Sequence, residues 1–184
     1  FNTGMTGYQE IFTDPSYSHQ IVVMGSAHVG NTGVNLEDVE SASLYLGGVV
    51  VRDYCLPSSW RSKGSLHNYL KCAGIPAISD VDTREITQAL RDEGAQRAVI
   101  FPKSLANGKD PLVFGGSLMD KVPSMEGLEL VSLVSCKAPY EFQDERCLKG
   151  KNTIGTVVVY DFGVKFNILR SFTERGFKVW VVPY

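Results

Sequence analysis

The chain has 184 residues, a formal net charge of −2, and 43% hydrophobic and 21% charged residues, a balance typical of globular proteins. No basic stripe indicates a nucleic-acid partner, and no apolar run approaches the length of a membrane span. No secretory signal is visible, so we expect a cytoplasmic protein, with an organellar location as the alternative.

The first elements follow from capping and hydrophobic patterns. Thr6 and Gln9 fit a capping box and predict a short helix from about Gly7 to Thr13, which the Asp14-Pro15 pair ends. A weaker pattern predicts a helix over residues 37–46. The next segments are predicted as strands at 21–24, 49–51 and 77–78, a glycine-rich loop at 30–33, and a helix between the cap Ser65 and Gly74.

The middle of the chain contains the clearest helix signal. Asp82 is the predicted N-cap of a helix with an apolar stripe at Ile86, Ala89 and Leu90, and Gly94 is its predicted end. After it the pattern predicts a strand at 99–100, loops over 106–123, a helix from 124 through 134, and a polar linker over 141–152.

The last part of the chain follows a strand–helix–strand pattern. Residues 156–160 are predicted as a strand, Asp161-Phe162-Gly163 as a tight turn, 166–175 as a helix and 177–182 as a second strand. Such a unit has parallel strands and a right-handed crossover. The expected fold is therefore α/β, with a mixed domain over 1–145 and the first βαβ unit of a parallel domain over 153–184.

Candidate functional residues are few when the residues are considered alone. Asp161-Phe162-Gly163 resembles the magnesium-binding tripeptide of kinases, but the other kinase motifs are absent. The turn does follow a parallel strand, where open α/β sheets bind ligands. Lys165, just after it, could hold an anionic group or be an ordinary solvated lysine. Ser16 alone would be taken as a plain turn residue.

The cysteines and histidines do not predict a metal or a nucleophile. The four cysteines form no CxxC pair and the three histidines are scattered, so no zinc site is expected. None of the cysteines lies in a G-x-C-x-G elbow. No catalytic residue is therefore expected in this chain, and the thiols are expected to be reduced.

Four stretches carry a resemblance to a known family: residues 1–22 (FNTGMTGYQEIFTDPSYSHQIV), 28–35 (HVGNTGVN), 80–96 (DVDTREITQALRDEGAQ) and 157–176 (VVVYDFGVKFNILRSFTERG). The chain closely resembles the small, glutamine-hydrolysing subunit of carbamoyl phosphate synthetase, truncated at both ends. The resemblance implies an amino-terminal β/β/α domain followed by a flavodoxin-like class I glutamine amidotransferase domain, of which only the first βαβ unit is expected here.

The same resemblance implies a reaction. A cysteine thiolate attacks the side-chain amide of glutamine, and ammonia passes to the large subunit. There the ammonia reacts with carboxyphosphate, which the large subunit makes from bicarbonate and ATP with magnesium. A second ATP then gives carbamoyl phosphate for arginine and pyrimidine synthesis. The nucleophile, and the histidine and glutamate that assist it, are expected outside this chain. The resemblance assigns glutamine binding to Ser16, in the matching TDPSY motif, and to Lys165.

Two other functions remain possible from the sequence. The chain could belong to a docking module that holds the synthetase subunit without hydrolysing glutamine. A flavodoxin-like nucleotide binder is a weaker alternative, because DFGVKFN has too few glycines for a phosphate loop.

Overall fold

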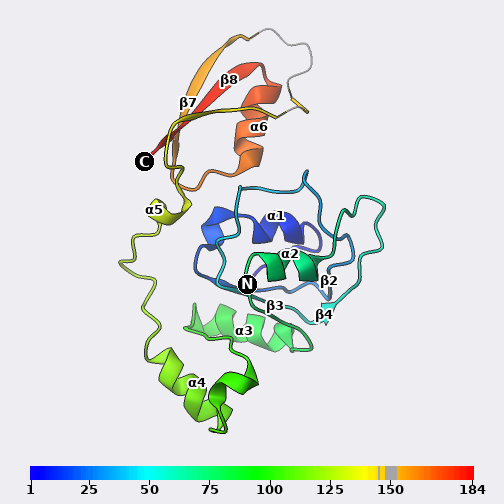
Figure 1. Ribbon diagram of the computed structural model, residues 1–184, viewed down its shortest axis with the longest axis vertical. Helices are drawn as coiled ribbons and strands as arrows, with labels where there is room; N and C mark the ends of the chain where they lie inside the picture. Colours follow the sequence, from blue (N-terminus) through cyan, green and yellow to red (C-terminus); the bar gives the residue numbers. More distant parts are fainter. Residues whose placement is uncertain (145, 148–152) are drawn as a thin grey trace.

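The computed structural model describes residues 1–144, 146–147 and 153–184, which form a mixed α/β protein with parallel sheets (Figure 1). In the first unit the strands β1 (Ile21–Val23), β3 (Gly48–Val50) and β5 (Ala77–Ile78) form a parallel sheet in the order β1-β3-β5. The short strands β2 (His28–Val29) and β4 (Asp53–Tyr54) form a second parallel pair. The predicted strands at 21–24, 49–51 and 77–78 are confirmed, with small differences at their ends.

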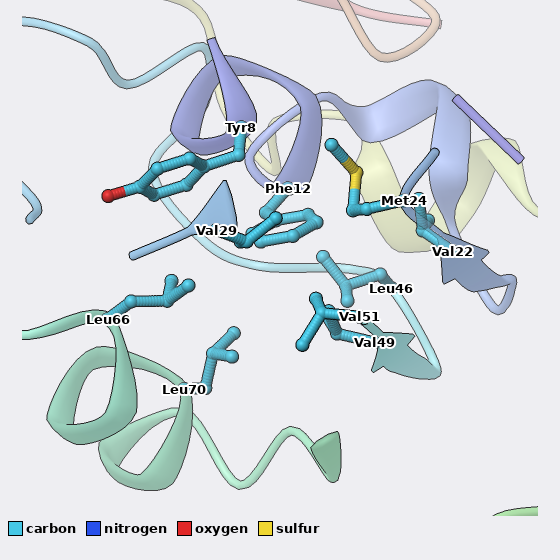
Figure 2. Packing of buried hydrophobic residues seen from close by; sticks show 10 residues of the cluster. All are labelled: Tyr8, Phe12, Val22, Met24, Val29, Leu46, Val49, Val51, Leu66 and Leu70. Atoms are coloured by element: carbon cyan, nitrogen blue, oxygen red, sulfur yellow. The ribbon is translucent and has the colours of Figure 1, made fainter. Parts of the chain in front are cut away.

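The core of the first unit lies between these strands and two helices, α1 (Tyr8–Phe12) and α2 (Leu66–Cys72). Figure 2 shows aromatic side chains from α1, leucines from α2 and β-branched side chains from the strands pointing toward one another. Parallel strands are usually covered on both faces, so their residues are apolar in near-continuous runs. The buried set is Tyr8, Phe12, Val22, Met24, Val29, Leu46, Val49, Val51, Leu66 and Leu70.

Two of the predicted helix caps are confirmed and one is wrong. Ser65 Oγ accepts the Asn68 N–H at the start of α2, and Asp82 accepts two N–H groups at the start of α3 (Thr83–Glu93). The predicted helix at 7–13 is confirmed as α1, but its N-cap is Gly7, with φ 79° and no side-chain cap. Gln9 does not turn back to Thr6; its amide exchanges hydrogen bonds with the backbone of Asn35.

Several predictions for the middle of the chain are wrong. Residues 37–46 form no helix, because the backbone of Glu40 bonds Thr13 Oγ1 and the Phe166 N–H instead of helical neighbours; Glu40 and Ser41 are buried. Residues 99–100 are not a strand, and Ala89 in the predicted stripe of α3 is exposed. The range 106–123, predicted as loops, contains the helix α4 (Pro111–Met119), and the 3-10 helix η2 (Lys103–Ala106) lies just before it. The predicted helix over 124–134 is reduced to α5 (Val131–Val134).

The second unit contains the predicted strand–helix–strand pattern. Strands β7 (Gly155–Asp161) and β8 (Phe177–Pro183) are parallel, and α6 (Phe166–Glu174) connects them. The strand β6 (Tyr140–Phe142) pairs antiparallel with β8, giving the order β6-β8-β7. The linker predicted over 141–152 is thus wrong at its start, where Glu141 and Phe142 belong to a sheet; residues 145 and 148–152 of it lie outside the described residues.

The core of the second unit lies between its sheet and α6, with Phe142, Leu169, Val179 and Val181 buried. In Figure 1 the first turn of α6 faces the first unit. Within the described part of the chain, no helix has the length and apolar composition needed to cross a membrane.

Candidate functional site

The Asp14-Pro15-Ser16 segment forms a tight turn directly after α1. Asp14 is the N-cap of the 3-10 helix η1 (Pro15–Tyr17), and its Oδ1 accepts the Ser16 N–H at 2.9 Å. Pro15 occupies the first helical position, where its fixed φ is favourable. The Gln20 side chain donates to the Ser16 carbonyl at 3.0 Å. The backbone of Ser16 is therefore held from both sides, while its side chain is exposed.

The second turn of the site follows β7. Asp161 is buried, and its Oδ1 accepts the N–H groups of Gly163 and Val164, each at 3.0 Å. Its Oδ2 accepts the Cys136 N–H at 2.7 Å. Because three backbone donors use this carboxylate, Asp161 shapes the turn and joins it to the segment before β6. This arrangement agrees with rejection of the kinase-like interpretation.

The two turns lie against each other although about 145 residues separate them in the sequence. Lys165 Nζ lies 2.7 Å from Asp14 Oδ2. A Cβ atom on Gly163 would lie 3.1 Å from Pro15 Cβ, so the absence of a side chain permits the approach. The hydrogen bond to Asp14 raises the pKa of Lys165 above its ordinary value, so the ammonium stays charged. Its side chain is 43% exposed, which leaves it accessible to a ligand.

Glu40 is a third component of the site that the sequence did not indicate. Its side chain is buried and forms an ion pair with Arg170 of α6, with Oε1 and Nη2 2.7 Å apart. Oε2 accepts the Asn167 N–H at 2.8 Å, and the Glu40 carbonyl accepts the Phe166 N–H at 2.9 Å. Lys165, the N-cap residue of α6, provides no side-chain cap, so Glu40 fulfils that function from another segment.

Two cavities border the turns. One, of about 670 Å³, lies between the units and is lined by Asp14, Lys165, Glu40 and Arg170, among others. The other, of about 460 Å³, is lined by Pro15 together with Tyr45, Tyr140 and Asp161, among others. Ser16 does not line either of these two cavities. The structure connects Ser16 and Lys165 through Asp14, whose Oδ1 accepts the Ser16 N–H and whose Oδ2 pairs with Lys165 Nζ.

Two of the thiols, Cys136 and Cys147, are disfavoured as thiolates by their surroundings. Burial raises the pKa of Cys136, and Asp161 raises it further; burial also raises the pKa of Cys147. Cys55 Sγ lies 3.6 Å from His28 Nδ1, a spatial pair that spacing in the sequence could not show. Among the described residues, no group of three or more His, Cys, Asp or Glu side chains could hold a metal ion.

The residues missed by the sequence analysis are Glu40 and Arg170. Glu40 lies in a serine-rich segment without periodicity. The sequence did contain one signal, which is Arg170 itself. It follows the apolar Leu169 in an amphipathic helix, and a charged residue on the buried side of a helix needs a partner. That signal does not identify the partner, since the two residues are 130 positions apart in the sequence.

Comparison with known proteins adds independent evidence. Residues 1–100 match the family model described as carbamoyl-phosphate synthase small chain, CPSase domain. Proteins named carbamoyl phosphate synthase small chain from Solidesulfovibrio magneticus and Neisseria gonorrhoeae are each 45% identical, over 194 and 191 residues. One of the same name from Halomonas eurihalina is 43% identical over 197 residues. These alignments cover 100% of this chain and 49–50% of each relative, so the chain spans about half their length.

Proposed function

Since the chain belongs to the carbamoyl-phosphate synthase small-chain family, we propose that it is the part of a glutamine-hydrolysing subunit that holds the amino-acid end of glutamine. The parent protein releases ammonia from glutamine through a cysteine thioester and passes it to a large subunit. That partner uses bicarbonate, ATP and magnesium to make carbamoyl phosphate. The reaction takes place in the cytoplasm and serves arginine and pyrimidine synthesis.

The observation that supports this proposal best is the contact between the two turns. A substrate site built from two units needs rigid groups that meet at their boundary, and ligand sites often lie at such boundaries. Here Asp14 holds Ser16 through the backbone and Lys165 through an ion pair. The hydroxyl of Ser16 and the ammonium of Lys165 suit the carboxylate of an amino acid, since one donates a hydrogen bond and the other is cationic.

The proposal includes the domain architecture. The sequence pattern places a β/β/α domain at residues 1–145 and the start of a flavodoxin-like amidotransferase domain at residues 153–184. We assign β6, at the end of the first range, to the second domain, because it pairs with β8. The parallel β7–α6–β8 unit supports the second assignment, because flavodoxin-like sheets are built from such units. In this arrangement the turn after β7 lies at the carboxyl end of a parallel strand, where open α/β sheets bind ligands.

The decisive experiment uses the full-length parent and the Ser16→Ala variant. The KM for glutamine, measured by glutamate release, should be at least about tenfold higher in the variant. The lost hydrogen bond to a charged group contributes about 1.5–3 kcal/mol to binding. Carbamoyl phosphate formation from added ammonia should be unchanged, since free ammonia bypasses the glutamine site. Steady-state kinetics with each nitrogen donor measure both quantities.

The matched control is Ser18→Ala, two residues away in the same segment. Ser18 is buried and its hydroxyl lies 3.3 Å from His19 Nδ1, so its removal should leave the KM for glutamine unchanged. An unaltered KM in Ser16→Ala would exclude Ser16 from the glutamine site. A parent that releases no glutamate would contradict the glutaminase assignment and favour the docking module.

A further inference from the structure

Glu40 connects the two units through more contacts than its ion pair alone. Its backbone N–H donates to Thr13 Oγ1 at 2.9 Å, and the neighbouring Ser41 hydroxyl donates to the Thr13 carbonyl at 2.5 Å. Thr13 directly precedes the Asp14-Pro15-Ser16 turn and is fully buried. The loop around Glu40 is thus attached to the end of α1, at the residue from which the turn begins.

On its other side Glu40 holds the start of α6. Its carbonyl and carboxylate accept the Phe166 and Asn167 N–H groups, and the carboxylate also binds Arg170. Arg170 Nη1 donates to the Val39 carbonyl at 3.2 Å. A carboxylate at a helix N-terminus is favoured by the helix dipole and by the unpaired N–H groups there. Lys165 is the residue immediately before this helical turn.

These contacts close a ring. It runs from Glu40 through Thr13 to Asp14, from Asp14 through the ion pair to Lys165, and from the first turn of α6 back to Glu40. We propose, on the basis of the glutamine site described above, that Glu40 is a positioning residue that fixes the distance between Ser16 and Lys165. It acts through Thr13 and α6 and does not touch the substrate.

A carboxylate is needed at this position for a specific reason. Its two oxygens accept from two different donors, the Asn167 N–H and the Arg170 guanidinium, in a buried place. A glutamine side chain has only one oxygen, and its NH₂ group would face one of the two donors. One donor would therefore lose its partner, which is costly for a buried polar group. Glu40→Gln changes the shape of the side chain very little, so it tests the electrostatic fit.

The test measures glutamine kinetics in the full-length parent with Glu40→Gln. The KM for glutamine should rise at least about tenfold, because small misplacements of positioning groups have effects of up to about a hundredfold. The rate with added ammonia should stay at the wild-type level. Hydrogen exchange should be faster both at residues 13–18 and at the first turn of α6, on opposite sides of Glu40.

Three further variants complete the design. Glu40→Asp keeps the charge beside Arg170 but is shorter by one methylene, so it should raise the KM less and remain folded. Arg170→Met combined with Glu40→Gln should be no worse than Glu40→Gln alone, because the pair acts as a unit. Glu37→Gln is the matched control. Glu37 lies three residues before Glu40 and forms an exposed ion pair with Arg61, so its substitution should leave the KM for glutamine unchanged.

The outcomes separate the two proposals. Normal glutamine KM and exchange in Glu40→Gln, in a parent that hydrolyses glutamine, would overturn the positioning function of Glu40. Equal losses with glutamine and with ammonia would also overturn it, because they would show a general loss of folded protein. A wild-type parent without glutaminase activity would instead contradict the proposed function, and the positioning function of Glu40, which rests on it, would fail with it.

Discussion

At the scale of single residues, Gly163 allows the turn after β7 to pack against Pro15 and Val134. Its φ is +93°, and an added Cβ would lie 3.0 Å from Val134 Cγ2 and 3.1 Å from Pro15 Cβ. Such a φ costs a non-glycine residue about 1–2 kcal/mol. Gly163 is thus required both for its positive φ and for the lack of a side chain at this contact. Substitutions can separate the two requirements.

We predict that Gly163→Ala lowers the free energy of unfolding by more than the conformational cost alone. Gly94→Ala is the control, because Gly94 has a similar φ of +83° but no atom within 4 Å of an added Cβ. Urea unfolding of both variants measures the difference. Equal losses in the two would show that Pro15 and Val134 move aside without cost.

The fold strongly raises the pKa of the Tyr140 phenol. Burial, followed by the negative charge of Asp161, raises its pKa from 10.0 to about 12. Above pH 10 the unfolded chain loses this proton while the folded chain retains it until about pH 12. The unfolded state therefore binds fewer protons, and the free energy of unfolding falls as the pH rises through this range.

We predict that Tyr140→Phe removes part of this alkaline loss of stability. Its free energy of unfolding should fall less steeply than that of the wild type between about pH 10 and pH 12. Urea titrations at a series of pH values give both slopes. Parallel curves throughout this range would show that the phenol of Tyr140 titrates equally in the folded and unfolded chains.

At the scale of elements, the sequence predicted those whose signals are local. The helices α2 and α3 have their caps in Ser65 and Asp82, and β7 and β8 are runs of β-branched and aromatic residues. Helix α4 was missed although its signal was present. Asp110 caps it and Pro111 occupies its first position, but the two glycines within it suggested a loop.

The elements that could not be predicted depend on distant partners. Strand β6 has three residues and no alternation, and it exists because it pairs with β8, about 40 residues later. The segment over 37–46 contains enough helix-forming residues to suggest a helix, yet its backbone is held by Thr13 and α6. The same limit applies to the site: the motif around Ser16 is local, whereas Glu40 and Arg170 meet only in the folded protein.

At the scale of the whole molecule, the described residues form two hydrophobic cores with a polar boundary between them. The first core lies between α1, α2 and the β1-β3-β5 sheet, and the second between α6 and the β6-β8-β7 sheet. Among the described residues, the ion pairs that cross the boundary join Lys165 to Asp14 and Arg170 to Glu40. Such ion pairs add little to the free energy of unfolding, because the cost of desolvating the charges offsets much of their attraction. Their main effect is to fix the relative positions of the groups that they join.

We therefore predict that this 184-residue chain unfolds in two steps, since each core can lose its packing while the other keeps its own. Hydrogen exchange at increasing urea concentrations should give different midpoints for β3, in the first core, and β8, in the second. Arg170→Met should separate the midpoints further by weakening the boundary, whereas a control substitution in the exposed pair, Arg91→Met, should leave their separation unchanged. A single shared midpoint for β3 and β8 in the wild type would show that the boundary couples the cores into one cooperative unit.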